Sequence, residues 1–402
     1  MLRHYNKLNR GEYQGGAPSL IARFRAFCTG YDWLQIFALL VLLSAGLLFI
    51  YSTGQQVGTA ASQSYFGKQL QWLLFGCGLW FLVSLVDCRK IWFQVFAVVF
   101  YLVSIALLIV VLNPKIGIKV NGAMSWLAIP GAGFRLQPAE PAKIATILLL
   151  SGMFSSPLFK VNNIFCLGLA GGGTLLPLLL IARQPDFGSA MVFLPVLAGI
   201  AYAAGLRWRH ILTLGAVVLI IGGSAVLNEV YQYKPMLKPY QRNRIMVFFQ
   251  PDADPHNSGY NQRQARLAVG SGGFSGKGVG QGTQNSLGFL PHTISNNDFI
   301  FSVIAEETGY LGCFLLISSY AMLLLTAIRT AWDAEFFGRY IAVGIACMIF
   351  THCFVNIGMS IGLAPITGIP LPFVSYGGSF LLTGLISCGL LQAIYRRNEQ
   401  KE

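Results

Sequence analysis

Long apolar stretches recur along the whole 402-residue chain, and they constrain its fold more than any other feature. Each runs for roughly 17 to 22 residues, which as a helix is long enough to cross about 30 Å of hydrocarbon. Only 11% of the residues are charged, less than half of the roughly 25% that a soluble protein carries. The sequence therefore predicts a polytopic membrane protein. It excludes a soluble enzyme, a nucleic-acid-binding protein and a disordered chain.

The apolar stretches predict ten transmembrane helices, because continuous apolar runs are unlike the alternating pattern of a membrane barrel. The predicted spans are Leu34–Tyr51, Leu70–Val86, Ile91–Leu112, Ala142–Phe154, Ile164–Ala182, Phe187–Gly205, Ile211–Leu227, Phe301–Ala327, Ile341–Leu363 and Phe373–Ile394. They form a single all-α transmembrane domain, residues 34–394, between an N-terminal tail at 1–33 and a C-terminal tail at 395–402. A long loop, residues 228–298, joins the seventh and eighth spans.

Lysine and arginine residues set the predicted orientation, because they accumulate in cytoplasmic segments. With the N-terminus inside, the inner segments carry fifteen of them and the short outer loops carry five. Both termini are therefore predicted to be cytoplasmic, and this distribution explains the net charge of +13 without a nucleic-acid partner. The polar segments rich in glycine and proline then fall on the outer face. A synthetic reaction there needs a substrate with its own activated leaving group, such as a lipid pyrophosphate.

Ionisable residues at the start of the fourth span are the first candidates for a site. Glu140 and Lys143 stand three residues apart, so they share one helix face and can pair. Charged groups at membrane depth are costly and are usually paired or functional. The two residues therefore form either a structural ion pair or part of a substrate site. Trp126 and Arg135 precede them in the same outer loop, where a tryptophan is ordinary at a membrane interface.

Two aspartates, Asp186 and Asp298, each lie where a span begins from the outside. Helix capping explains such a position without any further role. The alternatives are a contact to a polar substrate or to the long loop for Asp186, and a general base at the water–lipid boundary for Asp298. Glu306 and Glu307 follow about two turns deeper, where adjacent carboxylates disfavour joint ionisation unless they face a cavity or cations.

The long loop is rich in glycine around Lys277. Its backbone N–H groups could converge on an anion, with Lys277 and Gln284 beside it as polar contacts suited to phosphate. The segment is not a P-loop, because Ser271 and Gly278 stand where that motif needs glycine and serine or threonine. A flexible tether is the alternative interpretation.

Prolines and glycines gather again around Ser375, inside a hydrophobic stretch. They predict non-helical backbone at membrane depth, which is tolerated only against protein or a water-filled cavity. The segment is therefore expected to line a cavity that opens to the outside.

These segments together resemble the SEDS family of bacterial membrane proteins, over nearly the whole chain. The most specific match is Gly368-Ile-Pro-Leu-Pro-Phe-Val-Ser-Tyr-Gly-Gly-Ser379. Further matches are Asp298-Phe-Ile-Phe, Ala305-Glu-Glu-Thr-Gly309, Gln184-Pro-Asp186, and Gln137-Pro-Ala-Glu140 with Lys143. The runs Gly272–Gly278 and Gly282–Gln284 resemble the elongation-specific branch of the family more than its division-specific branch. One departure is the run Leu290-Pro-His-Thr-Ile-Ser-Asn-Asn-Asp298-Phe, which has two residues more than the family's usual Leu-Pro-Glu-x-His-Thr-Asp-Phe and lacks its glutamate.

The resemblance implies a ten-span helical fold and an inverting peptidoglycan glycosyltransferase. Such an enzyme polymerises lipid II into glycan strands on the outer face of the bacterial inner membrane, during the cell elongation that sets cell shape. The catalytic aspartate falls on Asp298, and the other family positions fall on Trp126, Arg135, Glu140 and Lys143. The remaining candidates for substrate binding are Asp186, Lys277, Gln284 and Ser375.

The resemblance also implies components beyond the chain. A divalent cation, Mg²⁺ or Mn²⁺, is expected, although no ligands for it are assigned. The expected partners are a class B penicillin-binding protein, which cross-links the new strand, and other membrane proteins of the elongation complex.

Two other functions fit the same residues. One is a transporter that flips lipid II across the bilayer, since intramembrane charges and broken helices are also typical of that class. The other is a non-catalytic scaffold for the cross-linking enzyme. A flippase makes no polymer in detergent, and a scaffold tolerates changes at Asp298 and Glu140.

Overall fold

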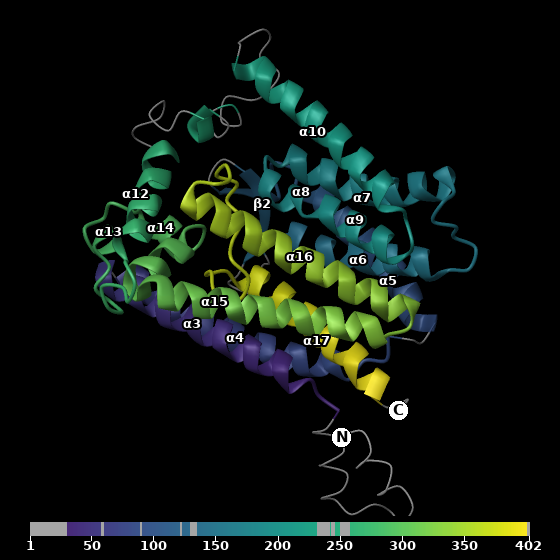
Figure 1. Cartoon of the computed structure of the whole chain (residues 1–402), viewed down its shortest axis with the longest axis horizontal. Helices are drawn as coiled ribbons and strands as arrows, with labels where there is room; N and C mark the ends of the chain where they lie inside the picture. Colours follow the sequence, from purple (N-terminus) through teal and green to yellow (C-terminus); the bar gives the residue numbers. More distant parts are fainter. Residues whose placement is uncertain are drawn as a thin grey trace, which may run out of the picture.

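The computed structural model describes residues 30–57, 60–88, 91–120, 123–128, 135–230, 242, 246–249 and 258–399. The described chain is mainly helical (Figure 1). Residues 1–29, most of the predicted N-terminal tail, lie outside the described residues, as do parts of the predicted loop 228–298.

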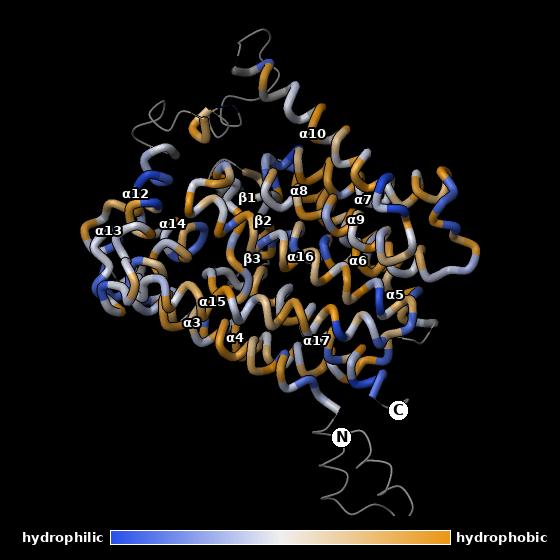
Figure 2. Tube along the Cα trace, viewed as in Figure 1, coloured by the Kyte–Doolittle hydropathy of each residue, from blue (hydrophilic) through white to orange (hydrophobic). Residues whose placement is uncertain are grey.

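Helices occupy every predicted span. They are α3 (Trp33–Val57), α4 (Ala60–Ser84), α5 (Ile91–Val110), α6 (Ala139–Ser155), α7 (Ile164–Arg183), α8 (Phe187–Met191) with α9 (Phe193–Ala203), α10 (Trp208–Val230), α15 (Ile300–Asp333), α16 (Phe336–Ile361) and α17 (Gly378–Glu399). Six helices of the described chain are long and apolar enough to cross a membrane, namely α3, α5, α7, α15, α16 and α17. Apolar residues run along these helices in Figure 2. The chain is therefore a multi-pass membrane protein.

Several of the predicted spans differ in their bounds from the helices found; α4 begins at Ala60 instead of Leu70, and α15 continues to Asp333 instead of Ala327. The last helix begins at Gly378 instead of Phe373, because the preceding prolines and the positive φ of Phe373 (67°) are incompatible with a helix. It also continues to Glu399, past the predicted end at Ile394, and basic residues in its last turn favour that extension. The sixth span is divided into α8 and α9, with Pro195 in the first turn of α9.

Helix α16 lies at the centre of the bundle and packs against α6, α9, α15 and α17. Helix α4 runs along α17, and α3 runs along α15. Apolar side chains from these helices and their neighbours form the core between them, among them Leu42, Ile147, Ile304, Ile345 and Leu385. Helix α10 extends away from this core at the top of Figure 1 and contacts α9. The core therefore fixes the ends of α6, α15, α16 and α17 relative to one another.

The connection between α5 and α6 contains a small antiparallel sheet, which the all-α prediction missed. Its strands are β1 (Gly117–Val120), β2 (Ala123–Ala128) and β3 (Arg135–Leu136), in that order across the sheet. Trp126 pairs with Ile118, and Arg135 pairs with Ala128. Strands this short, in a segment rich in glycine, carry too few residues to show an alternating pattern.

The helices α12 (Ser258–Ser271), α13 (Thr283–Ser286) and α14 (His292–Ser295) precede α15 in the chain. Helix α12 packs on α15 and α16. Helix α14 is a single turn formed by the run that is two residues longer than the family's usual motif. The added residues are therefore taken up in a helical turn before Asp298.

Gly309 interrupts α15 with a φ of 63°, and the loop after α12 supplies the backbone hydrogen bonds that the break removes. Before the break, loop N–H groups donate to helix carbonyls, and after it helix N–H groups donate to loop carbonyls. The four bonds are Lys277 N to Glu306 O (3.0 Å), Gly278 N to Glu307 O (2.9 Å), Tyr310 N to Gly273 O (2.9 Å) and Leu311 N to Phe274 O (3.1 Å). A side chain at Gly309 would meet the loop backbone, so glycine is required there.

Candidate functional site

Asp298 is half-buried just before the N-terminal end of α15, and its backbone is held by two other segments. The carbonyls of three consecutive residues each accept a hydrogen bond. The donors are Tyr376 N to Asn296 O (2.9 Å), Ser375 Oγ to Asn297 O (2.6 Å) and Asn356 Nδ2 to Asp298 O (2.8 Å). The predicted capping role of Asp298 is wrong, because Phe299 holds the N-cap position of α15 without a side-chain cap. The carboxyl-bearing residue is thus positioned by α16 and by the segment before α17.

The segment before α17 is non-helical and buried against protein, as predicted for the region around Ser375. Ser375 Oγ accepts a hydrogen bond from Leu371 N (2.8 Å), and Asn356 Nδ2 also donates to Ile369 O (2.7 Å). Gln69 of α4 binds the same segment on its other side. Burial, with Tyr65 nearby, raises the pKa of Tyr376 above its ordinary value, so its phenol is neutral at physiological pH.

Replacing Ser375 by alanine is expected to cost about 1–3 kcal/mol of stability, because Leu371 N–H and the Asn297 carbonyl lose their partner in a buried site. The same change should lower glycan polymerisation by loosening Asp298. The matched control is Ser387→Ala, which removes an equally buried hydroxyl bonded only within α17. Thermal unfolding and turnover of both variants test this, and equal effects of the two changes would contradict a role for Ser375 in positioning.

Glu140 and Lys143 form the predicted pair, and a third residue joins them. Lys143 Nζ lies 2.8 Å from Glu140 Oε1 and 3.0 Å from His352 Nε2 of α16. The side chains of Lys143 and Glu140 are only 1% and 3% exposed. Since an ammonium group only donates, His352 Nε2 accepts, and the neutral ring carries its proton on Nδ1. A cavity of about 10 Å³ adjoins the three groups and has room for one water molecule.

His352 and Asn356 are functional candidates that the sequence analysis missed. They stand four residues apart on α16, so they share one face of the helix and are separated by about 6 Å along its axis. His352 contacts the ion pair, and Asn356 contacts the backbone of Asp298. The sequence could have indicated these candidates, because they are two polar residues four positions apart in an otherwise apolar helix. Helix α16 thereby connects the buried pair to the aspartate.

The glycine-rich loop does bring N–H groups together around anionic groups. Those groups are the carboxylates of Glu306 and Glu307 in this same chain. Glu306 accepts bonds from Thr283 N, Thr283 Oγ1, Gln284 N and Lys277 Nζ, the last at 2.5 Å. Glu307 accepts bonds from Gly280 N, Ser52 Oγ and Gln56 Nε2. Lys277 and Gln284 therefore lie beside Glu306. A direct contact of either residue with substrate stays a prediction.

Asp186 caps α8, as predicted, and it also reaches the start of α6. Its Oδ1 accepts from Ser189 N (3.0 Å), and its Oδ2 accepts from Ser189 Oγ and Gln137 Nε2 (2.9 Å each). Gln137 is three residues before Glu140, and its carbonyl accepts a bond from Glu140 N (3.0 Å). Asp186 thus stabilises the start of α6, the helix that carries Glu140 and Lys143.

Trp126 and Arg135 lie together on the small sheet, where Trp126 is partly buried and Arg135 is exposed. Ser379 Oγ, in the first turn of α17, donates to the Arg135 carbonyl (3.1 Å). The sheet is therefore attached to the helix whose preceding segment holds Asp298. Arg135 supplies an exposed cation at this rim.

Some buried polar atoms without a partner among the described residues lie on residues that are near Asp298 in the chain or that contact its backbone. They are Asn296 Nδ2 and Oδ1, Ser302 Oγ and Asn356 Oδ1. Buried polar groups almost always have a hydrogen-bond partner in folded proteins. Each of these atoms could bind a buried water molecule.

The described residues do not form a cation site of their own. In that part of the chain no three His, Cys, Asp or Glu side chains lie close enough to hold a metal ion. Glu140, Glu306, Glu307 and Asp186 already accept hydrogen bonds from the protein. This donor set does not fit a protein-held divalent ion, which needs several oxygen ligands.

Comparison with known proteins gives consistent matches over most of the chain. Residues 32–400 match the family described as cell cycle protein, FtsW/RodA/SpoVE. The peptidoglycan glycosyltransferase RodA of Treponema pallidum is 32% identical, covering 91% of this chain and 98% of that protein. A protein named FtsW from Geobacter metallireducens is 36% identical, covering 91% and 95%.

A solved structure has the same fold. It was described as the structural coordination of polymerization and crosslinking by a peptidoglycan synthase complex. Its matching chain is 28% identical with a TM-score of 0.75, covering 92% of this chain and 99% of the other. The predicted likeness to the SEDS proteins, RodA among them, is confirmed.

Proposed function

The chain belongs to the FtsW/RodA/SpoVE family, and from this premise we propose how its outer site works as a peptidoglycan glycosyltransferase. The observation that carries the proposal is the set of hydrogen bonds to the carbonyls of Asn296, Asn297 and Asp298, which fixes the backbone that bears one half-buried carboxylate. A carboxylate on a fixed backbone is suited to act as a general base, because the base must meet the sugar hydroxyl in a defined geometry.

The proposed reaction is an inverting glycosyl transfer. The Asp298 carboxylate takes the proton of the acceptor's GlcNAc 4-hydroxyl, and that oxygen attacks the anomeric carbon of the donor MurNAc. The bond between this carbon and the pyrophosphate oxygen breaks, and undecaprenyl pyrophosphate departs with the electron pair.

The leaving pyrophosphate needs a cation, and Arg135 suits this role best. It is exposed at the rim, whereas Lys143 is buried in its pair and Lys277 is bound to Glu306. A guanidinium also matches two phosphate oxygens at once. Trp126, on the neighbouring strand, would cover the same region.

The proposed topology has ten spans, with both termini in the cytoplasm of a bacterium and the loop 228–298 on the outer face of the inner membrane. The excess of lysine and arginine in the inner segments supports this orientation. It puts Asp298, Glu140 and Ser375 at the outer end, where lipid II presents its sugars. The tails at 1–33 and 395–402 would lie inside.

The proposal includes partners and a cation. A class B penicillin-binding protein is the expected partner, supported by the likeness to a chain of a peptidoglycan synthase complex. Other elongation-complex membrane proteins follow from the family. A divalent cation, Mg²⁺ or Mn²⁺, is expected to accompany the substrate's pyrophosphate, since such ions commonly bind through substrate phosphates. No step of the reaction is assigned to it.

The purified full-length chain in detergent, supplied with lipid II and Mg²⁺ or Mn²⁺, is expected to form glycan polymer. A chelator should abolish the product, and added divalent ion should restore it. Gel separation of the strands, with and without the cross-linking partner, measures both effects. A lipid II flippase or a scaffold would give no polymer under any of these conditions, and that result would overturn the proposed function.

A further inference from the structure

The run of residues 290–299, which is two residues longer than the family's usual motif, sets the path of the chain into Asp298. It contains the single helical turn α14. The Ile294 carbonyl in this turn accepts hydrogen bonds from Asn297 N (3.2 Å) and Phe299 N (3.1 Å). These two N–H groups flank Asp298 in the chain, so the position of α14 constrains the backbone that bears the carboxylate.

The Ser295 hydroxyl, at the end of α14, connects this turn to α13. Its Oγ donates a hydrogen bond to Asn285 Oδ1 (2.9 Å), and both residues are buried. Asn285 Nδ2 in turn donates to Gln56 Oε1 (2.6 Å) and to the Thr53 carbonyl (3.3 Å), both in α3. Helices α13 and α14 lie near one end of α3 in Figure 1, and both contact it. The turn before Asp298 is therefore attached to α3 through one buried amide.

The donor and acceptor roles in this network follow from the groups at its ends. A backbone carbonyl only accepts, so the Asn285 nitrogen faces Thr53 and its oxygen faces Ser295. Gln56 then presents its oxygen to Asn285 and its nitrogen to Glu307 of α15, where Nε2 donates to Oε1 (2.6 Å). Both N–H groups and the oxygen of Asn285 are thus paired. The network joins α14 to α3 and, through Gln56, to α15.

Hydrogen bonds in this network fix a degree of freedom that apolar packing leaves open. Leu290, Ile294 and Phe299 pack in one apolar cluster, but the burial of apolar surface is non-directional. Such packing keeps the run buried without setting the rotation of the turn. A hydrogen bond weakens steeply as it bends, so the bond between Ser295 and Asn285 sets that rotation.

We propose that Ser295 and Asn285 are positioning residues, whose hydrogen bond orients Asp298 toward the acceptor hydroxyl. They act through α14 and the Ile294 carbonyl on the backbone that bears the carboxylate, and not on the sugars. The inference rests on the proposed role of Asp298 as the general base. It also gives the longer run a function, because the added residues are taken up in the turn and Ser295 anchors that turn to the network that ends at Glu307.

Ser295→Ala in the full-length chain is expected to lower kcat per folded molecule by about tenfold to 100-fold in glycan polymerisation, because a misplacement of about 1 Å can cost that much. KM for lipid II should stay within about twofold, since the change removes no contact to the substrate. Asn285→Ala should give a similar loss, and the double variant should lose no more than the worse single variant. Amides in residues 291–299 should exchange with deuterium about tenfold faster in Ser295→Ala.

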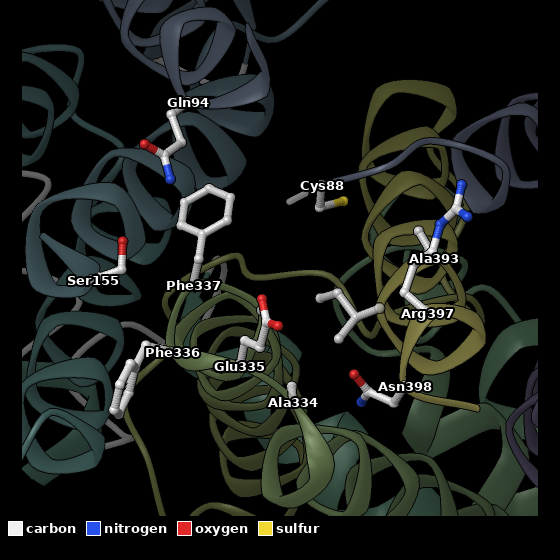
Figure 3. A pocket seen from close by; sticks show the side chains of 12 residues that line it. Cys88, Gln94, Ser155, Ala334, Glu335, Phe336, Phe337, Ala393, Arg397 and Asn398 are labelled. Carbon is white, nitrogen blue, oxygen red and sulfur yellow. The ribbon is translucent and has the colours of Figure 1, made fainter. Parts of the chain in front are cut away.

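The matched control is Ser155→Ala, which makes the same chemical change far from Asp298. The Ser155 hydroxyl donates to the Gly152 carbonyl within α6 (3.1 Å). It lines a cavity of about 280 Å³ that adjoins the other end of α15 (Figure 3). This variant should keep the kcat and the exchange rates of the unaltered chain.

A merely structural role for Ser295 predicts lower stability with kcat per folded molecule unchanged. That result in Ser295→Ala, with Asp298→Asn inactive, would overturn the inference and leave the proposed function in place. Additive losses in the double variant, or unchanged exchange in residues 291–299, would also overturn it. If the unaltered chain forms no polymer, the proposed function fails and the inference fails with it.

Discussion

Asp298→Asn is expected to abolish glycan polymerisation while the protein still folds and inserts. The amide keeps the size of the side chain but cannot take the proton of the acceptor hydroxyl. General-base catalysis is worth about 100- to 10,000-fold, so the rate should fall by at least two orders of magnitude. The backbone bonds that hold Asn296, Asn297 and Asp298 do not involve the carboxylate and should survive.

The assay is strand formation from lipid II in detergent, with thermal unfolding measured on the same sample. Asp333→Asn is the matched control, because it makes the same change at an exposed site at the other end of α15. It should keep full activity. Polymerisation by Asp298→Asn within tenfold of the unaltered chain would remove Asp298 from the chemistry.

Lys143→Met is expected to cost about 3–5 kcal/mol of stability, because it leaves the Glu140 carboxylate buried without a counter-charge. Glu140→Gln combined with Lys143→Met should recover most of this loss, since two neutral side chains of similar volume then replace the pair. Lys160→Met, at an exposed position, should change stability by no more than about 0.5 kcal/mol. Thermal and denaturant unfolding in one detergent measure all three.

The double variant shows whether an uncompensated charge on Glu140 causes the loss of stability. If it is as unstable as Lys143→Met alone, the loss does not come from an uncompensated charge. His352 then becomes the contact to examine, since Lys143 Nζ also lies 3.0 Å from its Nε2.

Local patterns were sufficient to predict the helices and the contacts within one turn. The length of each apolar run predicted a helix where one is found, and the spacing of three residues identified the pairing of Glu140 with Lys143. The capping role of Asp186 was likewise predictable from its position before an apolar run. These features depend on residues that are neighbours in sequence.

Contacts between distant segments could not be predicted in this way. Glu307 binds Ser52, which lies 255 residues away, and Asn356 binds Asp298, which lies 58 residues away. The break at Gly309 depends on such contacts too. The glycines near Lys277 indicated anion binding correctly, but only the fold showed that the anion is Glu306.

The break in α15 also determines how rigidly the first part of that helix is oriented. Residues 273–278 form two hydrogen bonds with α15 before Gly309 and two after it. These bonds make the bend rigid, so it does not act as a hinge. The direction in which the segment Ile300–Thr308 presents Asp298 is therefore set by a loop that precedes it by about twenty residues. Substitutions in that loop can misalign the reaction without touching the lipid substrate at all.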